Sequence, residues 1–146
     1  MSEHDAITNV GQVIQLALAP VFLLSGIAGM LAVMTNRLSR VIDRARQVEG
    51  LLPSTSGPQL PLLHSELGAL CRRAKLTYTG ILLCTITALC VSAVVGALFL
   101  GAFFEFNARI PVALLFVAGM ATFFAALLCF LREVFIATSG LRIGPR

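Results

Sequence analysis

Charged residues are scarce in this chain of 146 residues: they make up 12% of it, 58% is hydrophobic, and the mean hydropathy is +0.91. A soluble globular domain typically has about 25% charged and about 45–50% apolar residues. The composition therefore excludes one soluble domain, and it equally excludes intrinsic disorder. The few charges are spread unevenly, which argues against a basic nucleic-acid-binding surface. The sequence predicts a protein whose solvent is a lipid bilayer.

Residues that carry chemistry are almost as rare. Histidine occurs only at His4 and His64, which the orientation argued below places on opposite sides of the membrane, where they cannot share a metal ion or a haem. The sequence has no glycine-rich phosphate loop, no nucleophile elbow, and no acid inside its apolar runs that could relay protons. We therefore expect neither an enzyme nor a cofactor or metal.

Three stretches contain no Asp, Glu, Lys or Arg: residues 6–36, 76–104 and 110–131. Each exceeds the roughly 20 residues that a helix needs to cross the hydrocarbon core. None shows the period-two alternation of a membrane-barrel strand, and an open sheet would leave backbone groups unpaired in lipid. The predicted fold is all-α, a single integral membrane domain with transmembrane helices at about residues 8–36, 76–104 and 110–131.

The basic residues predict the orientation. Seven of the eleven Lys and Arg residues lie in residues 37–75, and three more lie in the tail, residues 132–146. Basic residues in short loops are retained on the cytoplasmic side. We expect the N-terminus outside, the C-terminus inside, and a location in an inner (plasma) membrane. The small residues at 17–19 resemble a signal-peptide cleavage site, but a basic n-region is missing and Pro20 follows, so we expect a retained helix.

The polar segment, residues 37–75, has the pattern of a cytosolic antiparallel helical hairpin that continues the first two spans. Its tip, residues 53–61, contains three prolines, which a helix interior does not tolerate. On either side of the tip, apolar residues recur at three-four spacing and are expected to pack against each other. They are Leu38, Val41, Ile42, Ala45, Val48 and Leu52 before the tip, and Leu63, Leu67, Leu70 and Ala74 after it.

A stripe of polar and small residues follows one side of the first predicted helix. Its members, called here the first-helix stripe, are Gln15, Phe22, Ser25, Gly26, Gly29 and Asn36, and the stripe runs on into Arg37, Arg40 and Arg44. Packing within the chain, an interface between copies, and the lining of a pore all fit it. The arginines fit a cytosolic mouth, ordinary helix-surface ion pairs, or contacts to lipid head groups.

The second predicted helix carries its own stripe, the second-helix stripe, at heptad spacing: Tyr78, Thr85, Ser92 and Gly96. We expect these residues to pack helices together. The cysteines are expected to pack as well, because Cys71 faces the reducing side and Cys84, Cys90 and Cys129 lie in apolar runs without C-x-x-C spacing.

Two motifs carry a resemblance to a known family. They are QLALAPVFLLSGIAG at residues 15–29 and TNRLSRVIDRAR at residues 35–46, joined later by FLRE at 130–133 and LRI at 141–143. With them the chain resembles a bacterial family of small inner-membrane proteins catalogued as a domain of unknown function (DUF2721). The resemblance implies a bacterial inner membrane and three spans, and it implies no activity, substrate or cofactor.

The patterns favour a self-associating membrane protein, a scaffold or regulator that presents its cytosolic hairpin to a protein partner or to its own copies. The alternative is a homo-oligomeric ion channel with a basic, anion-favouring cytosolic mouth. The expected partners are membrane lipid and further copies of the chain, and nucleic acid is not expected.

Overall fold

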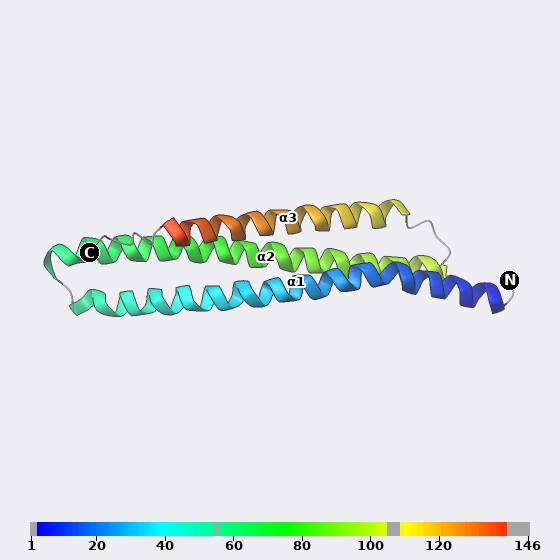
Figure 1. The fold of residues 1–146 in the computed structure, drawn as a ribbon, viewed down its shortest axis with the longest axis horizontal. Coiled ribbons are helices and arrows are strands. Elements are labelled where there is room, and N and C mark those ends of the chain that lie inside the picture. The colour runs from blue at the N-terminus through cyan, green and yellow to red at the C-terminus, as the bar shows by residue number, and fades with distance from the viewer. Residues whose placement is uncertain (1–2, 55, 105–108, 140–146) are drawn as a thin grey trace. The chain divides into compact units, whose positions relative to one another are not determined.

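The computed structural model describes residues 3–54, 56–104 and 109–139, and these form three long helices (Figure 1). Helix α1 runs from Glu3–Leu51, α2 from Leu60–Phe104 and α3 from Arg109–Ser139. Two short 3-10 turns, Leu52–Ser54 and Gly57–Gln59, lie between α1 and α2. The structure confirms the all-α prediction.

All three helices are long and apolar enough to cross a membrane. Only 17%, 22% and 11% of their most apolar windows are buried inside the protein. The rest of this apolar surface faces outward, including Phe103, Leu114 and Phe124, which are 65–81% exposed. Contact between such a surface and lipid hydrocarbon carries no free-energy penalty, whereas contact with water is unfavourable. The chain therefore has the composition and surface of a membrane protein.

Buried residues recur every seven positions along each helix, the spacing of helices that pack in the manner of a left-handed coiled coil. Along α1 they are Ile27, Met34, Val41 and Val48. Along α2 they are Leu70, Thr77, Cys84 and Val91, and Gly80, Thr87 and Val94 follow the last three of these by three places. Along α3 they are Gly119, Ala126 and Glu133.

The chain divides into two compact units, and each unit contains part of every helix. The first unit comprises Met1–Met30 and Leu83–Phe124. In it α2 and α3 approach closely at Gly119, where an added Cβ would lie 3.2 Å from the Cβ of Cys90. One turn away, the hydroxyls of Thr87 and Thr122 lie 2.9 Å apart and share a hydrogen bond.

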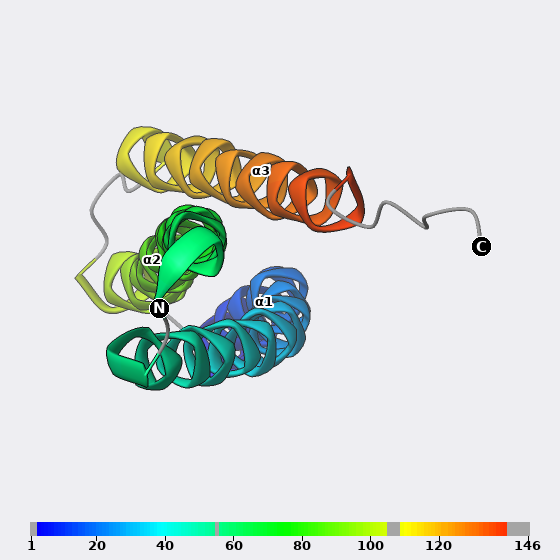
Figure 2. The same ribbon diagram turned by 90° about the vertical axis from the view of Figure 1, so that its left-hand side faces the viewer.

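The second unit comprises Leu31–Leu82 and Ala125–Arg146. Its α2 segment lies between those of α1 and α3 (Figure 2). A Cβ on Gly80 would lie 3.2 Å from Met34 Cε on α1 and 3.7 Å from the carbonyl oxygen of Ala126 on α3. An apolar cluster continues the packing of α1 on α2. It consists of Val41, Ala45, Val48, Leu63, Leu67, Leu70 and Ala74. All seven belong to the apolar residues on either side of the tip that the three-four spacing predicts to pack against each other.

The helical break falls within residues 52–59, slightly shorter than the expected tip at residues 53–61. Gly57 has φ +80°, a left-handed backbone conformation that glycine adopts without strain. Its neighbours Pro53 and Pro58 lie in the two 3-10 turns. The sequence also predicts that the third helix stops near Gly140, and this residue lies outside the described residues.

Candidate functional site

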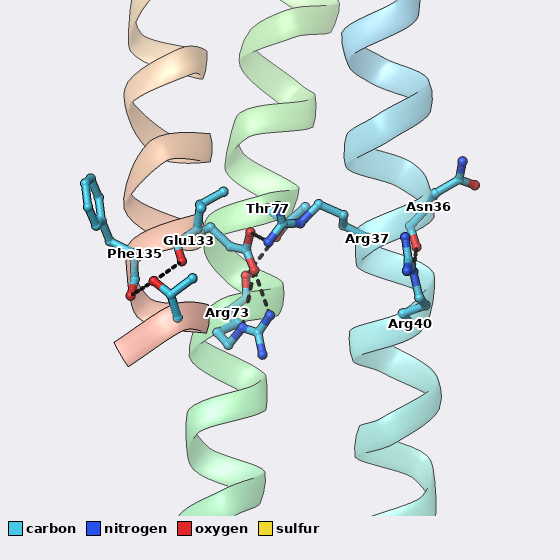
Figure 3. A network of polar contacts seen from close by, with 9 residues as sticks. Asn36, Arg37, Arg40, Arg73, Thr77, Glu133 and Phe135 are labelled. Atoms are coloured by element: carbon cyan, nitrogen blue, oxygen red, sulfur yellow. Dashed lines mark hydrogen bonds and ion pairs between the residues drawn. The ribbon is translucent and has the colours of Figure 1, made fainter. Parts of the chain in front are cut away.

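In the second unit one carboxylate, that of Glu133 on α3, contacts arginine side chains of both other helices. Its Oε1 accepts hydrogen bonds from Arg73 Nε and Nη2 on α2, at 3.3 and 3.0 Å. Its Oε2 lies 2.7 Å from Arg37 Nη2 on α1, an ion pair whose angles do not make a hydrogen bond. Figure 3 shows the three side chains converging; Arg37, Arg73 and Glu133 are called here the glutamate network.

The glutamate network is largely sequestered from solvent. Glu133 is 1% exposed, and the side chains of both arginines are 26% exposed. The Arg37 guanidinium also lies 5.2 Å from the ring centroid of Phe130, within range of a cation–π contact. One turn along α2, the Thr77 hydroxyl donates to the carbonyl oxygen of Arg73 at 3.1 Å, so that hydroxyl, itself buried, is satisfied. The buried carboxylate thus contacts arginines of both other helices, and removal of either partner would leave its charge less compensated away from water.

A pocket of about 390 Å³ lies between α1 and α2 beside this network. We call it the arginine pocket. Its lining is Arg37, Arg40, Val41, Arg44, Leu70 and Arg73. Arg37 and Arg73 contact Glu133, and Arg44 pairs with Glu66 at 2.7 Å. Arg40 instead donates from Nε to the carbonyl oxygen of Asn36, one turn earlier in its own helix (Figure 3).

A second basic pocket, of about 260 Å³, lies between α2 and α3. We call it the boundary pocket. It is lined by Arg72, Lys75, Leu76, Thr79, Arg132 and Ile136. Within the described ranges, the recorded ion pairs involve Arg37, Arg44 and Arg73 and none of the three cations of this pocket.

All six members of the first-helix stripe are exposed, with Phe22 at 74%. The buried residues of α1 lie on the opposite side of the helix. Open space surrounds Gly26 and Gly29, where an added Cβ meets no atom within 4 Å. Packing inside one chain is therefore not what this stripe does; contacts outside the chain stay as predictions.

The second-helix stripe is exposed too: Tyr78, Thr85, Ser92 and Gly96 all face outward. The buried seam of α2 passes one residue away, through Thr77, Cys84 and Val91, which is about 100° round the helix. Within the chain, the buried seam of α2 therefore runs beside the second-helix stripe, and a packing role of the stripe stays a prediction.

Sequence reasoning did not find Glu133 as the centre of a network. One signal was present, since Glu133 lies two residues after the end of the third apolar run, next to Arg132, in the tail that holds three of the eleven basic residues. A charge at the edge of a span needs a partner, but the partners lie on other helices, at positions 37 and 73. Of the three arginines predicted for the cytosolic mouth, Arg37 turns inward to Glu133, while Arg40 and Arg44 are exposed.

Nothing in the described ranges resembles a metal centre, since no three His, Cys, Asp or Glu side chains gather there. The four cysteines are free thiols, with Cys71 exposed and Cys84 buried.

Comparison with known proteins identifies a family. A family model described as protein of unknown function (DUF2721) matches residues 17–143. No curated protein and no solved structure matches the chain.

Proposed function

Since the chain belongs to this family of proteins of unknown function, we propose from its own residues that it is a bacterial inner-membrane protein that associates with copies of itself and acts as a scaffold or regulator. In this proposal residues 37–75 form a cytosolic helical stalk, the N-terminus lies outside, and the C-terminus lies inside. The excess of Lys and Arg in residues 37–75 and 132–146 supports this orientation.

The first-helix stripe is the observation that carries self-association. Lipid supplies no hydrophobic drive for packing between membrane helices, so their association depends on close van der Waals contact. Small residues allow the two backbones to approach closely enough for that contact. Inside the chain that role falls to Gly80 and Gly119, each with a neighbouring side chain 3.2 Å from the position of a Cβ. Gly26 and Gly29 have the same small size on an exposed face with open space around them. A helix of a second copy fits this face.

The stalk supports a role in presenting a surface to a partner. Its apolar residues Val41, Val48 and Leu70 are buried in its own cluster, while its polar residues Arg46, Glu49 and Arg72 are exposed. A purely lipid-facing protein has no need for two helical arms of this polarity. The exposed polar sides are therefore the surfaces that we propose a partner, or another copy, contacts.

The channel alternative receives less support from the arginines. A basic pore mouth needs several uncompensated charges around a shared axis. Arg37 is held by Glu133, and Arg44 is paired with Glu66, so only Arg40 of the three has no acidic partner in the described part of the chain. One such arginine per copy makes a weak anion filter.

The test is the mass of the intact protein in lipid nanodiscs, measured by light scattering or native mass spectrometry. We expect an assembly larger than one chain, and we expect a variant with Ser25→Leu and Gly29→Leu to shift toward the monomer. The matched control is Ala28→Leu, which adds similar bulk at an exposed position about 100° round the same helical turn from Gly29.

A monomeric wild-type protein contradicts the proposal. So does an assembly that survives the double substitution, or one that Ala28→Leu disrupts equally. A closed ring of four or more copies that conducts ions, with a selectivity that Arg40→Glu changes, favours the channel instead.

A further inference from the structure

We infer that the boundary pocket is a binding site for the phosphate group of an anionic phospholipid. This inference uses the three helices that are apolar enough to cross a membrane, and it does not depend on self-association.

The first observation is how α2 and α3 bring the cations of this pocket together. Arg72, Lys75, Leu76 and Thr79 have the spacing of one face of α2, and Arg132 and Ile136 lie one turn apart on α3. The two faces enclose a pocket of about 260 Å³ with three cations in its lining. Three like charges around one hollow repel one another, and an anion in the hollow relieves that repulsion.

The second observation is the use that the chain makes of its acids. Ion pairs in the described residues join Glu133 to Arg37 and Arg73, and Glu66 to Arg44. Arg132 precedes Glu133 in sequence, but the Glu133 carboxylate is committed to the other two arginines. In the part of the chain that the structure describes, no acid pairs with the cations of the boundary pocket, and these cations are exposed. This distinguishes the boundary pocket from the arginine pocket, where three of four arginines have acidic partners.

The third observation is the place of the pocket along the helices. Lys75 directly precedes the charge-free run that begins at Leu76, and Arg132 directly follows the run that ends at Leu131. In helices that cross a bilayer, these positions lie where hydrocarbon gives way to head groups. Leu76 and Ile136 give the same pocket apolar walls. A phospholipid offers both chemistries together, a phosphate for the cations and an acyl chain for the apolar walls.

The chemistry of the side chains suits a phosphate ester. A guanidinium offers parallel N–H donors that match two phosphate oxygens, and a lysine ammonium adds a compact charge. Basic pockets between transmembrane helices on the cytoplasmic side are a known form of lipid head-group site. Soluble phosphate has the same anionic group, so the experiment must separate the two sources.

The experiment is native mass spectrometry of the full-length protein in detergent, titrated with phosphatidylglycerol, with phosphatidylcholine, and with inorganic phosphate alone. We expect phosphatidylglycerol to bind in preference to phosphatidylcholine. Arg72→Gln, Lys75→Gln and Arg132→Gln should each weaken phosphatidylglycerol binding about fivefold, the effect of one basic residue near a membrane surface. Arg46→Gln is the matched control, because Arg46 is exposed and does not line the pocket.

Three results overturn the inference. The first is equal binding of both lipids, and the second is an equal loss of binding in Arg46→Gln, which indicates a diffuse charge effect. The third is inorganic phosphate that displaces the lipid and responds to the same pocket substitutions, which assigns the pocket to a soluble anion. Because the substituted side chains are exposed, an unchanged helical circular-dichroism spectrum is expected and keeps a loss of binding interpretable.

Discussion

Arg37 Nη2 on the first helix lies 2.7 Å from Glu133 Oε2 on the third. The other oxygen of the same carboxylate accepts two hydrogen bonds from Arg73 on the second helix. A charge that is 1% exposed is stable only while such partners are present. The glutamate network therefore joins the three helices within this unit through one buried carboxylate.

The first prediction compares this buried ion pair with an exposed one. Removing one partner of a buried pair typically costs about 3–5 kcal/mol, whereas an exposed pair contributes about 0–1 kcal/mol. Glu133→Gln should therefore lower the free energy of unfolding by about 3 kcal/mol, the lower end being expected because both arginines are partly exposed. Glu66→Gln, which breaks the exposed pair with Arg44, should lower it by less than about 1 kcal/mol.

Reversible unfolding in mixed detergent micelles, followed by circular dichroism, measures both changes. Added salt should weaken the contribution of Glu66 and leave that of Glu133 nearly unchanged, because salt screens exposed charges more than buried ones. Equal costs for the two substitutions contradict the structural role that we assign to Glu133.

The second prediction concerns the two glycines at close helix contacts. An added Cβ at Gly119 lies 3.2 Å from the Cβ of Cys90, an atom fixed to the backbone. At Gly80 the nearest atom, also at 3.2 Å, is the terminal Cε of Met34, which can move. Gly119→Ala should therefore destabilise the protein by about 1–3 kcal/mol, as overpacking does, and Gly80→Ala by less.

Gly68→Ala is the control for both, because Gly68 lies in α2 with open space around it. Alanine there should be neutral or should stabilise the helix by up to about 1 kcal/mol. The same unfolding experiment ranks the three variants. A larger loss at Gly80 than at Gly119 contradicts the packing described here.

The sequence predicts the packing of residues 37–75 better than that of residues 76–104, because the two segments differ in how clearly apolar residues stand out from polar ones. In residues 37–75 apolar residues stand out against a polar background, and seven of those selected by spacing form the observed cluster. In residues 76–104 almost every residue is apolar, so spacing alone does not say which side is buried. The heptad spacing predicts a packing stripe that includes Tyr78 and Thr85, which are exposed, while Thr77 and Thr87 are buried within the chain.

The glutamate network lay beyond sequence reasoning for a different reason. Its three members are far apart in the chain, and local spacing gives no information on which helix faces which. The basic residues in 37–75 and 132–146 indicate only that Glu133 has several possible cationic partners. The choice of Arg37 and Arg73 over Arg132 and Arg72 depends on the orientation of packed helices, which only the structure describes.

The third prediction concerns the hydrogen bond between Thr87 and Thr122, whose hydroxyls lie 2.9 Å apart between α2 and α3. Each hydroxyl carries one proton, so one of the two donates to the other across the helices. The accepting hydroxyl donates to a carbonyl oxygen of its own helix, that of Leu83 for Thr87 or that of Gly119 for Thr122. Hydrogen bonds between membrane helices average about 0.6 kcal/mol in double-mutant cycles. We expect a coupling energy of about that size between Thr87→Val and Thr122→Val.

The matched control for this cycle is Thr138→Val, because Thr138 is exposed and, among the residues that the structure describes, its hydroxyl bonds to carbonyls of its own helix. Combined with Thr87→Val, it should give a coupling energy near zero. A Thr87–Thr122 coupling that is indistinguishable from this control shows that the two hydroxyls contribute independently.

The fourth prediction tests the proposed orientation with the native cysteines. Cys71 is exposed and lies in the proposed cytosolic stalk, whereas Cys84 is buried in a predicted span. Cys90 and Cys129 are half-buried in predicted spans. A maleimide that cannot cross membranes should therefore label this protein in inside-out membrane vesicles. In intact spheroplasts the protein should remain unlabelled. Cys71→Ser should abolish this labelling, because hydrocarbon shields the other three thiols from a polar reagent.

A variant with Ser2→Cys is the opposite control, since a thiol near the N-terminus should react in spheroplasts. Labelling of Cys71 from outside, with Ser2→Cys protected, reverses the proposed orientation and moves the stalk and both basic pockets to the outer face.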